Sequence, residues 1–138
     1  MNQQHAQRKE IRLSDPDAVA KLLAETCASF AEAQYIFIAS RDGLVVASGN
    51  SSEGEEDGVA LRGSVIAAAA ASIGDHFAAL ASHGRSQSVL FEADRGCVGV
   101  FPLTSTLVLV VGSAQSVSLG RLSAAARKII AKLHAPDA

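Results

Sequence analysis

The first clear hydrophobic pattern along the chain lies in residues 14–30. Ser14 and Asp15 are capping residues, and Pro16 follows at the position that suits the first turn of a helix. Apolar residues then recur three or four positions apart. They predict one stripe on a helix of about 16 residues, made of Val19, Leu22, Leu23, Cys27 and Phe30. We expect residues 1–13 to be a flexible polar tail.

Two short apolar runs, residues 34–40 and 44–48, follow on either side of Arg41-Asp42-Gly43. Asp-Gly between two such runs predicts a β-hairpin. Neither run alternates between apolar and polar residues, as a hairpin with one solvent-facing side would. We therefore expect both faces of this hairpin to be covered.

A long helix is predicted from about residue 55 to near residue 83. One apolar seam follows a seven-residue spacing, with small or aromatic residues between: Val59, Gly63, Ile66, Ala70, Ile73, Phe77 and Leu80. A second apolar edge holds Leu61, Val65, Ala68 and Ala79. Residues 67–71 are all alanine, which allows another backbone to approach closely but is also the best helix former. We expect the sheet on one side of this helix and a partner on the other, without knowing which face meets which.

The residues before this helix are acidic, with Glu53, Glu55, Glu56 and Asp57 beside two glycines. Their spacing does not match a calcium-binding EF-hand loop. We interpret residues 53–57 as a solvated loop whose carboxylates favour the positive end of the helix.

The last part of the chain predicts three strands, over residues 86–93, 97–103 and 106–113. The third does not alternate, which is typical of a central strand buried on both faces. A closing helix is predicted from a stripe of Leu119, Leu122, Ala126, Ile129, Ile130 and Leu133. We expect Ser116 or Ser118 to cap its start. Lys128, Lys132 and His134 lie near its negative end, and Pro136 stops it.

The predicted order is α-β-β-α-β-β-β-α, which indicates an α/β (α+β) fold. We expect a five-stranded antiparallel sheet sandwiched by helices, in one domain over residues 14–138. The long middle helix would cover one face of the sheet. The first and last helices would cover the other.

Composition narrows the function classes. The 138 residues carry a net charge of -2, which argues against a nucleic-acid binder. No apolar run approaches the ~20 residues of a membrane span, and the polar N-terminus is not a secretory signal. Cys27 and Cys97 lie far apart and predict reduced thiols rather than a disulfide framework. We therefore expect a cytoplasmic protein with no membrane partner. The chain is Ala-rich and uses Arg more than Lys, which hints at a GC-rich bacterial gene.

Motifs for catalysis and cofactor binding are absent from the sequence. It has no P-loop, no nucleophile elbow and no Cys-x-x-Cys pair. His76 and His83 are seven residues apart, too far to share a metal on a helix. Cys97 has no histidine near it in sequence. We predict no catalytic residue, cofactor or metal, and hence no enzyme. One open alternative is that a loop arginine, Arg41 or Arg95, reaches the phosphate of a GTPase.

Taken together, these elements resemble the roadblock family, named for a dynein light chain, and its bacterial MglB-like members. The resemblance covers residues 15–134. It rests on the hairpin AQYIFIASRDGLVVAS (33–48), the long small-residue helix (55–83), the strand–turn–strand over 87–103, and the apolar strand 107–112 before the closing helix.

This resemblance implies a non-catalytic, dimeric interaction platform that regulates a small Ras-like GTPase, as an activating protein or co-regulator. The middle helices of a homodimer would pair side by side, and the third strands would join. Interface residues carried over from the family are Val59, Arg62, Ile66, Ala70, Ile73 and Phe77 on the helix. On the strand they are Ser88, Val89, Leu90, Phe91 and Glu92.

Two other functions remain open at this stage. The first is a structural dimerisation or adaptor module that binds a scaffold without nucleotide dependence. The second is a small-molecule sensor, which should show a pocket with convergent polar groups.

Overall fold

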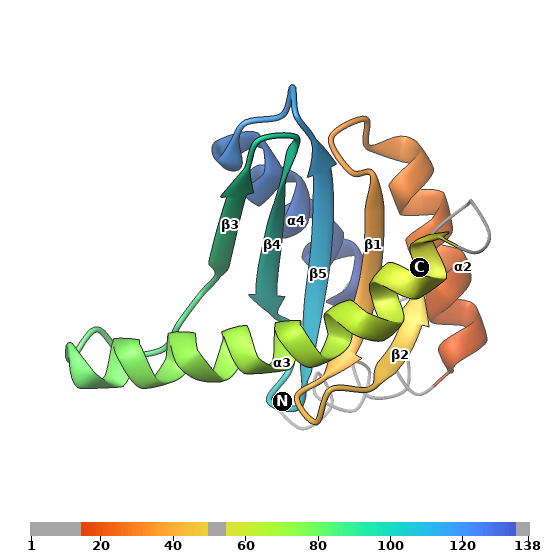
Figure 1. Ribbon diagram of the computed structural model, residues 1–138. Helices are drawn as coiled ribbons and strands as arrows, with labels where there is room; N and C mark the ends of the chain where they lie inside the picture. The colour runs from red at the N-terminus through yellow and green to blue at the C-terminus, as the bar shows by residue number, and fades with distance from the viewer. Residues whose placement is uncertain (1–14, 50–54, 135–138) are drawn as a thin grey trace.

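The computed structural model describes residues 15–49 and 55–134 and confirms the predicted order of elements (Figure 1). The elements are α2 (Pro16–Ser29), β1 (Tyr35–Ser40), β2 (Val45–Ser48), α3 (Glu55–Leu80), β3 (Val89–Ala93), β4 (Gly96–Pro102), β5 (Leu107–Ala114) and α4 (Leu119–His134). The predicted tail, Ser14, residues 50–54 and Pro136 lie outside the described residues.

The strands form one antiparallel sheet in the order β2-β1-β5-β4-β3. Strand β5 is central, between β1 and β4, and six of its consecutive residues are buried. The prediction of a strand covered on both faces is confirmed for β1 and β5. For the second hairpin run it is wrong, because Leu44 and Val45 are exposed. This run forms an edge strand, and Leu44 lies in the turn before it.

Two hydrophobic layers hold the helices to opposite faces of the sheet. On one face, α2 and α4 pack against inward residues such as Ile36, Leu109 and Val111. On the other face, α3 packs against Phe37, Val108 and other residues of the same strands. The arrangement of one helix on one side and two on the other is as predicted, and Figure 1 shows α3 crossing in front of the sheet with α4 behind it.

Local interactions define where the helices begin and end. The Asp15 carboxylate accepts a hydrogen bond from the Ala18 N–H (3.3 Å), and Ser118 Oγ accepts one from the Arg121 N–H (3.2 Å). Helix α3 ends where Ser82 adopts a φ of 59° and the His83 N–H donates to the Ala78 carbonyl (2.8 Å). This is a Schellman-type end with serine at the left-handed position that glycine usually occupies.

Small residues allow α3 to lie close to the sheet. The alanines at positions 60, 67, 70 and 71 are buried there. A Cβ at Gly63 would stand 3.2 Å from the Phe37 ring. Ser64 is buried as well, and its hydroxyl is satisfied by donating to the Ala60 carbonyl (2.6 Å). Much of the alanine run therefore faces the sheet.

Helix α3 is also long and apolar enough to match a membrane span, over Gly58–Leu80 with a mean hydropathy of 1.3. The expectation that no apolar run approaches this length is thus wrong for this segment. Length and composition alone are weak evidence for a span. Arg62 and Asp75 lie on the helix, and one of its faces packs on the sheet.

Candidate protein interface

One edge of α3 carries large apolar side chains that no other described residue covers. Val59, Ile66, Ile73, Phe77 and Leu80 are all exposed, with Phe77 at 68% and Leu80 at 85%. The C-terminal part of α3 extends past β3, beyond the edge of the sheet (Figure 1). We call the segment with Ile73, Phe77 and Leu80 the overhang. Contiguous exposed apolar surface is uncommon on soluble monomers, which makes this edge of α3 a candidate interaction site.

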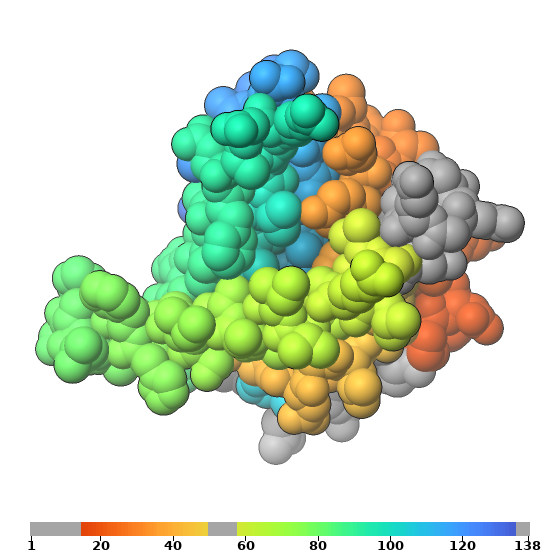
Figure 2. All heavy atoms as spheres, viewed as in Figure 1, coloured from red at the N-terminus to blue at the C-terminus, as the bar shows by residue number. Residues whose placement is uncertain are grey.

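Between this edge of α3 and the sheet lies an open groove of about 930 Å³. Its floor is made of strand residues on the face of the sheet that α3 packs against, among them Phe37, Val98, Val100 and Val110. Figure 2 shows the surface hollowed between α3 and the strands behind it. Tyr35 and Arg62 are the lining residues with hydrogen-bonding side chains. A groove with so few polar groups fits an apolar protein segment better than the polar ligand of a sensor.

The structure brings several predicted interface residues together. Val59, Arg62, Ile66 and Phe91 all line the groove. Ile73 and Phe77 lie on the same edge of α3, in the overhang.

The structure contradicts the prediction that Ala70 is an interface residue. It is only 6% exposed and belongs to the layer between α3 and the sheet. The apolar seam is broad, and its smallest members are turned toward the strands. Ala70 therefore supports the fold of one chain and is not accessible to a partner.

The strand predicted to pair in a dimer is present, and β3 forms an edge of the sheet. Within the described residues it pairs only with β4, so its other side carries unpaired backbone groups. Leu90, Phe91 and Glu92 are exposed, whereas Val89 is half-buried against α3. The prediction that the strand begins at Ser88 is wrong, because Ser88 precedes β3.

A second cluster of exposed apolar side chains lies on the opposite side of α3. We call this cluster the hairpin patch, and its members are Leu44, Val45, Leu61 and Val65. The turn of the hairpin touches α3, because a Cβ at Gly43 would stand 3.4 Å from Val65. The sequence indicated Leu61 and Val65 as a second apolar edge. It did not indicate that the start of β2 would join them in solvent.

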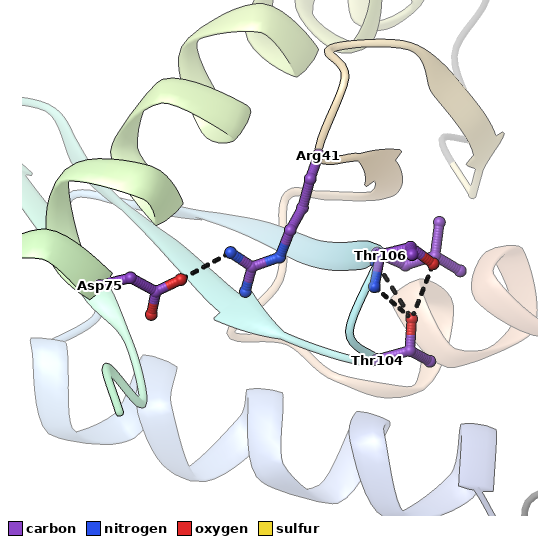
Figure 3. Close-up of polar contacts among 5 residues, drawn as sticks. Arg41, Asp75, Thr104 and Thr106 are labelled. Atoms are coloured by element: carbon purple, nitrogen blue, oxygen red, sulfur yellow. Dashed lines mark hydrogen bonds and ion pairs between the residues drawn. The ribbon is translucent and has the colours of Figure 1, made fainter. Parts of the chain in front are cut away.

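Arg41 is held by the protein itself. Its Nη1 lies 2.7 Å from Asp75 Oδ2 on α3 (Figure 3). Its backbone N–H donates to the Thr106 carbonyl (2.9 Å). Thr104 Oγ1 accepts from the N–H groups of Thr106 and Leu107, which closes the β4–β5 turn beside it. An Arg41 engaged in this way fixes α3 to the hairpin. Arg95 lies exposed in the β3–β4 turn.

The cysteine and histidine side chains considered above as catalytic or metal-binding candidates do not form a cluster in the described residues. Cys97 is buried, with its thiol 3.8 Å from the Val117 carbonyl, and Cys27 is half-buried. His76 and His83 are exposed. Across residues 15–49 and 55–134, no group of three or more His, Cys, Asp and Glu residues could hold a metal ion. Burial raises the pKa of the Tyr35 phenol, which lines the groove in its neutral form.

A family model identifies the family of this chain, and solved structures support its fold. The Roadblock/LC7 domain family matches residues 9–113. No curated protein is similar enough in sequence to count as a match.

Among solved structures, a Roadblock/LC7 domain from Streptomyces avermitilis has a TM-score of 0.70 at 17% identity, over 81% of this chain and 91% of that one. The gliding protein MglB from Thermus thermophilus has a TM-score of 0.66 at 19% identity, over 91% and 88%. Profilin II from Acanthamoeba castellanii has a TM-score of 0.57 at 13% identity, over 83% and 94%. At these identities the structural likenesses establish the roadblock and profilin-like fold.

Proposed function

The chain belongs to the Roadblock/LC7 family, and on this basis we propose that it is a dimeric, non-catalytic platform that binds and regulates a small Ras-like GTPase. The observation that supports the proposal most is the uncovered apolar surface along α3. It continues from the groove into the overhang, and it adjoins the free edge of β3. A single chain leaves this surface in water, whereas a second copy would bury it.

The shapes of the groove and the overhang are complementary within one chain. If two α3 helices lie antiparallel about a two-fold axis, the overhang of each would enter the groove of the other. Phe77 would then lie near Val59 and Gly63 of the second copy. The same axis would bring the two β3 edges together and extend the sheet. Such self-complementarity is what a two-fold interface requires, and a stable one buries about 800 Å² per partner.

The hairpin patch stays exposed in this dimer, because it lies on the far side of α3. We assign it to the GTPase. Leu44, Leu61 and Val65 offer an apolar contact, and Arg41 is paired with Asp75 rather than extended toward this surface. In this proposal the platform positions the catalytic groups of the GTPase and inserts no arginine. It would act in the cytoplasm, where such GTPases act.

The test is binding of the purified chain to Ras-like GTPases of its own genome, loaded in parallel with GDP or a GTP analogue. Hydrolysis of GTP is then timed with and without the chain. We expect tighter binding to the GTP form and a change in hydrolysis rate. Leu61→Glu should abolish binding while the dimer persists. Lys128→Gln, which changes the charge by the same amount at an exposed position of α4 on the other face of the sheet, is the matched control.

Equal binding to the two nucleotide forms would contradict GTPase regulation. A stable dimer in that experiment would then favour the adaptor function, with a scaffold as the partner.

A further inference from the structure

A small polar groove lies on the opposite face of the sheet from the α3 groove. It has a volume of about 280 Å³ and is formed by the α3–β3 linker, the end of β4 and the middle of α4. Its polar lining is Ser86, Gln87, Ser88, Ser123 and Arg127. Phe101, Pro102 and Ile130 supply an apolar wall.

These polar groups share two properties. None of their side chains makes a hydrogen bond or ion pair with any other described residue. Each of them can donate a hydrogen bond, and none carries a negative charge. Three hydroxyls, one amide and one guanidinium line the groove, without a carboxylate. The groove therefore presents unused donors and a positive charge.

Ser123 shows that these groups are not engaged locally. Serine or threonine within a helix often donates to the carbonyl four residues earlier. Thr26, Ser29 and Ser64 all do so in this chain, at 2.6–2.8 Å. Ser123 lies inside α4 and makes no such bond, so its hydroxyl remains available to the groove.

Arg127 differs in the same way from two other arginines of the chain. Arg41 pairs with Asp75 and Arg121 pairs with Glu32. Arg127 has no carboxylate partner among the described residues, although it lies on α4 less than two turns after Arg121. A guanidinium presents a planar fork that binds carboxylate or phosphoryl oxygens through two parallel hydrogen bonds.

We infer that this polar groove binds the oxyanion, carboxylate or phosphoryl, of a ligand that also has an apolar part. Arg127 contacts the oxyanion. The hydroxyls of Ser88 and Ser123 donate to its remaining oxygens, and the apolar part packs on Phe101, Pro102 and Ile130. The Ser86 side chain lies against Gly74 of α3 and is not counted among the donors. The site lies on the opposite face of the sheet from the α3 groove and the hairpin patch, and at Ser88 it adjoins the β3 edge that we propose pairs in the dimer.

The test uses the full chain labelled with ¹⁵N and three probes: inorganic phosphate, phenyl phosphate and the peptide acetyl-Leu-Glu-Leu-amide. NMR shifts of the amides of residues 86–88 and of Arg127 Nε report binding. We expect saturable shifts at these positions and tighter binding of phenyl phosphate than of inorganic phosphate. Saturation by both phosphates alone would identify a phosphoryl ligand, and saturation by the peptide an acidic protein segment.

Arg127→Gln should weaken binding by about tenfold or more, the effect of losing charge-assisted hydrogen bonds. Lys128→Gln is the matched control, because Lys128 is exposed, adjacent and outside the groove lining. It should leave binding unchanged. Equal weakening in both variants would show only general charge attraction and would overturn the inference. So would the absence of shifts at residues 86–88 with all three probes. GTPase binding by Arg127→Gln should stay normal, which separates this result from the proposed function.

Discussion

Arg41 Nη1 lies 2.7 Å from Asp75 Oδ2, and this ion pair joins the turn of the β1–β2 hairpin to α3. Asp75 lies within the overhang, between Ile73 and Phe77, so the pair links the hairpin turn to that segment of α3. The two side chains are 28% and 42% exposed, and solvent therefore weakens their attraction.

We predict a coupling free energy of about 0.5 kcal/mol between Arg41 and Asp75, within the range for partly exposed pairs. The measurement is a double-mutant cycle of Arg41→Ala, Asp75→Ala and the double variant by urea unfolding. High salt should reduce the coupling. Strictly additive losses would mean that the pair does not hold α3.

The proposed dimer predicts different outcomes for two substitutions on the same helix. Ile73→Glu should give a folded monomer, because Ile73 is exposed on the apolar edge of α3. Ala70→Glu should instead destabilise the fold by about 3 kcal/mol or more, because it places a carboxylate between α3 and the sheet. Light scattering gives the mass, and circular dichroism with urea gives the stability.

Ser72→Glu is the control for charge, since Ser72 is exposed next to Ile73 but on another side of the helix. It should remain a dimer. An unchanged dimer in Ile73→Glu would reject this edge of α3 as the interface.

Gly112 lies directly opposite Tyr35 in the β1–β5 ladder, and a Cβ at this position would overlap the tyrosine ring. That ring also stacks on Phe37, with centroids 6.2 Å apart. Gly112→Ala should therefore lower the free energy of unfolding by about 1–3 kcal/mol. Urea unfolding measures the loss. Gly120→Ala in α4, where a Cβ meets nothing within 4 Å, should cost nothing. Similar stability of the two variants would contradict the close packing of Tyr35.

Tyr35 is the single tyrosine of a chain that has no tryptophan, so its ionisation can be followed by absorbance. Burial raises the pKa of its phenol above the ordinary value of 10.0, because the charged form is poorly solvated. The associated stability is fully present below the unfolded pKa and is lost as the pH rises through the folded one. We expect a titration midpoint above 10.0.

The Tyr35 midpoint should fall in Ile73→Glu if a second copy covers the groove in the wild type. A midpoint at or below 10.0 in the folded wild type would show that the phenol is well solvated.

Much of the fold follows from local signals in the sequence. The Asp42-Gly43 turn, the non-alternating β5 and the stripes of α2 and α4 each correspond to an observed element. These signals are informative because a helix buried along one stripe and a strand buried on both faces each require a characteristic spacing of apolar residues.

The parts that sequence did not predict depend on how elements cross. Ala70 and Ile73 belong to the same apolar seam, but the angle of α3 on the sheet buries the first and exposes the second. The sequence predicts Leu44 and Val45 as buried, because no local pattern indicates which strand lies at an edge of the sheet. The polar groove joins a linker, a strand end and a helix that are distant in the chain, so no single segment predicts it.

The strand order also has a consequence for how the chain folds. Strands β3, β4 and β5 are consecutive neighbours, and β1 and β2 form their own hairpin, so both units can form from short-range contacts. Joining them requires Ile36 to meet Val111, which closes a loop over most of the chain. Among the strand pairings this closure spans the longest stretch of chain, and we expect the β1–β5 ladder to form after the two local units. We expect the close fit of Tyr35 over Gly112 to form with that ladder, where the two parts of the sheet meet.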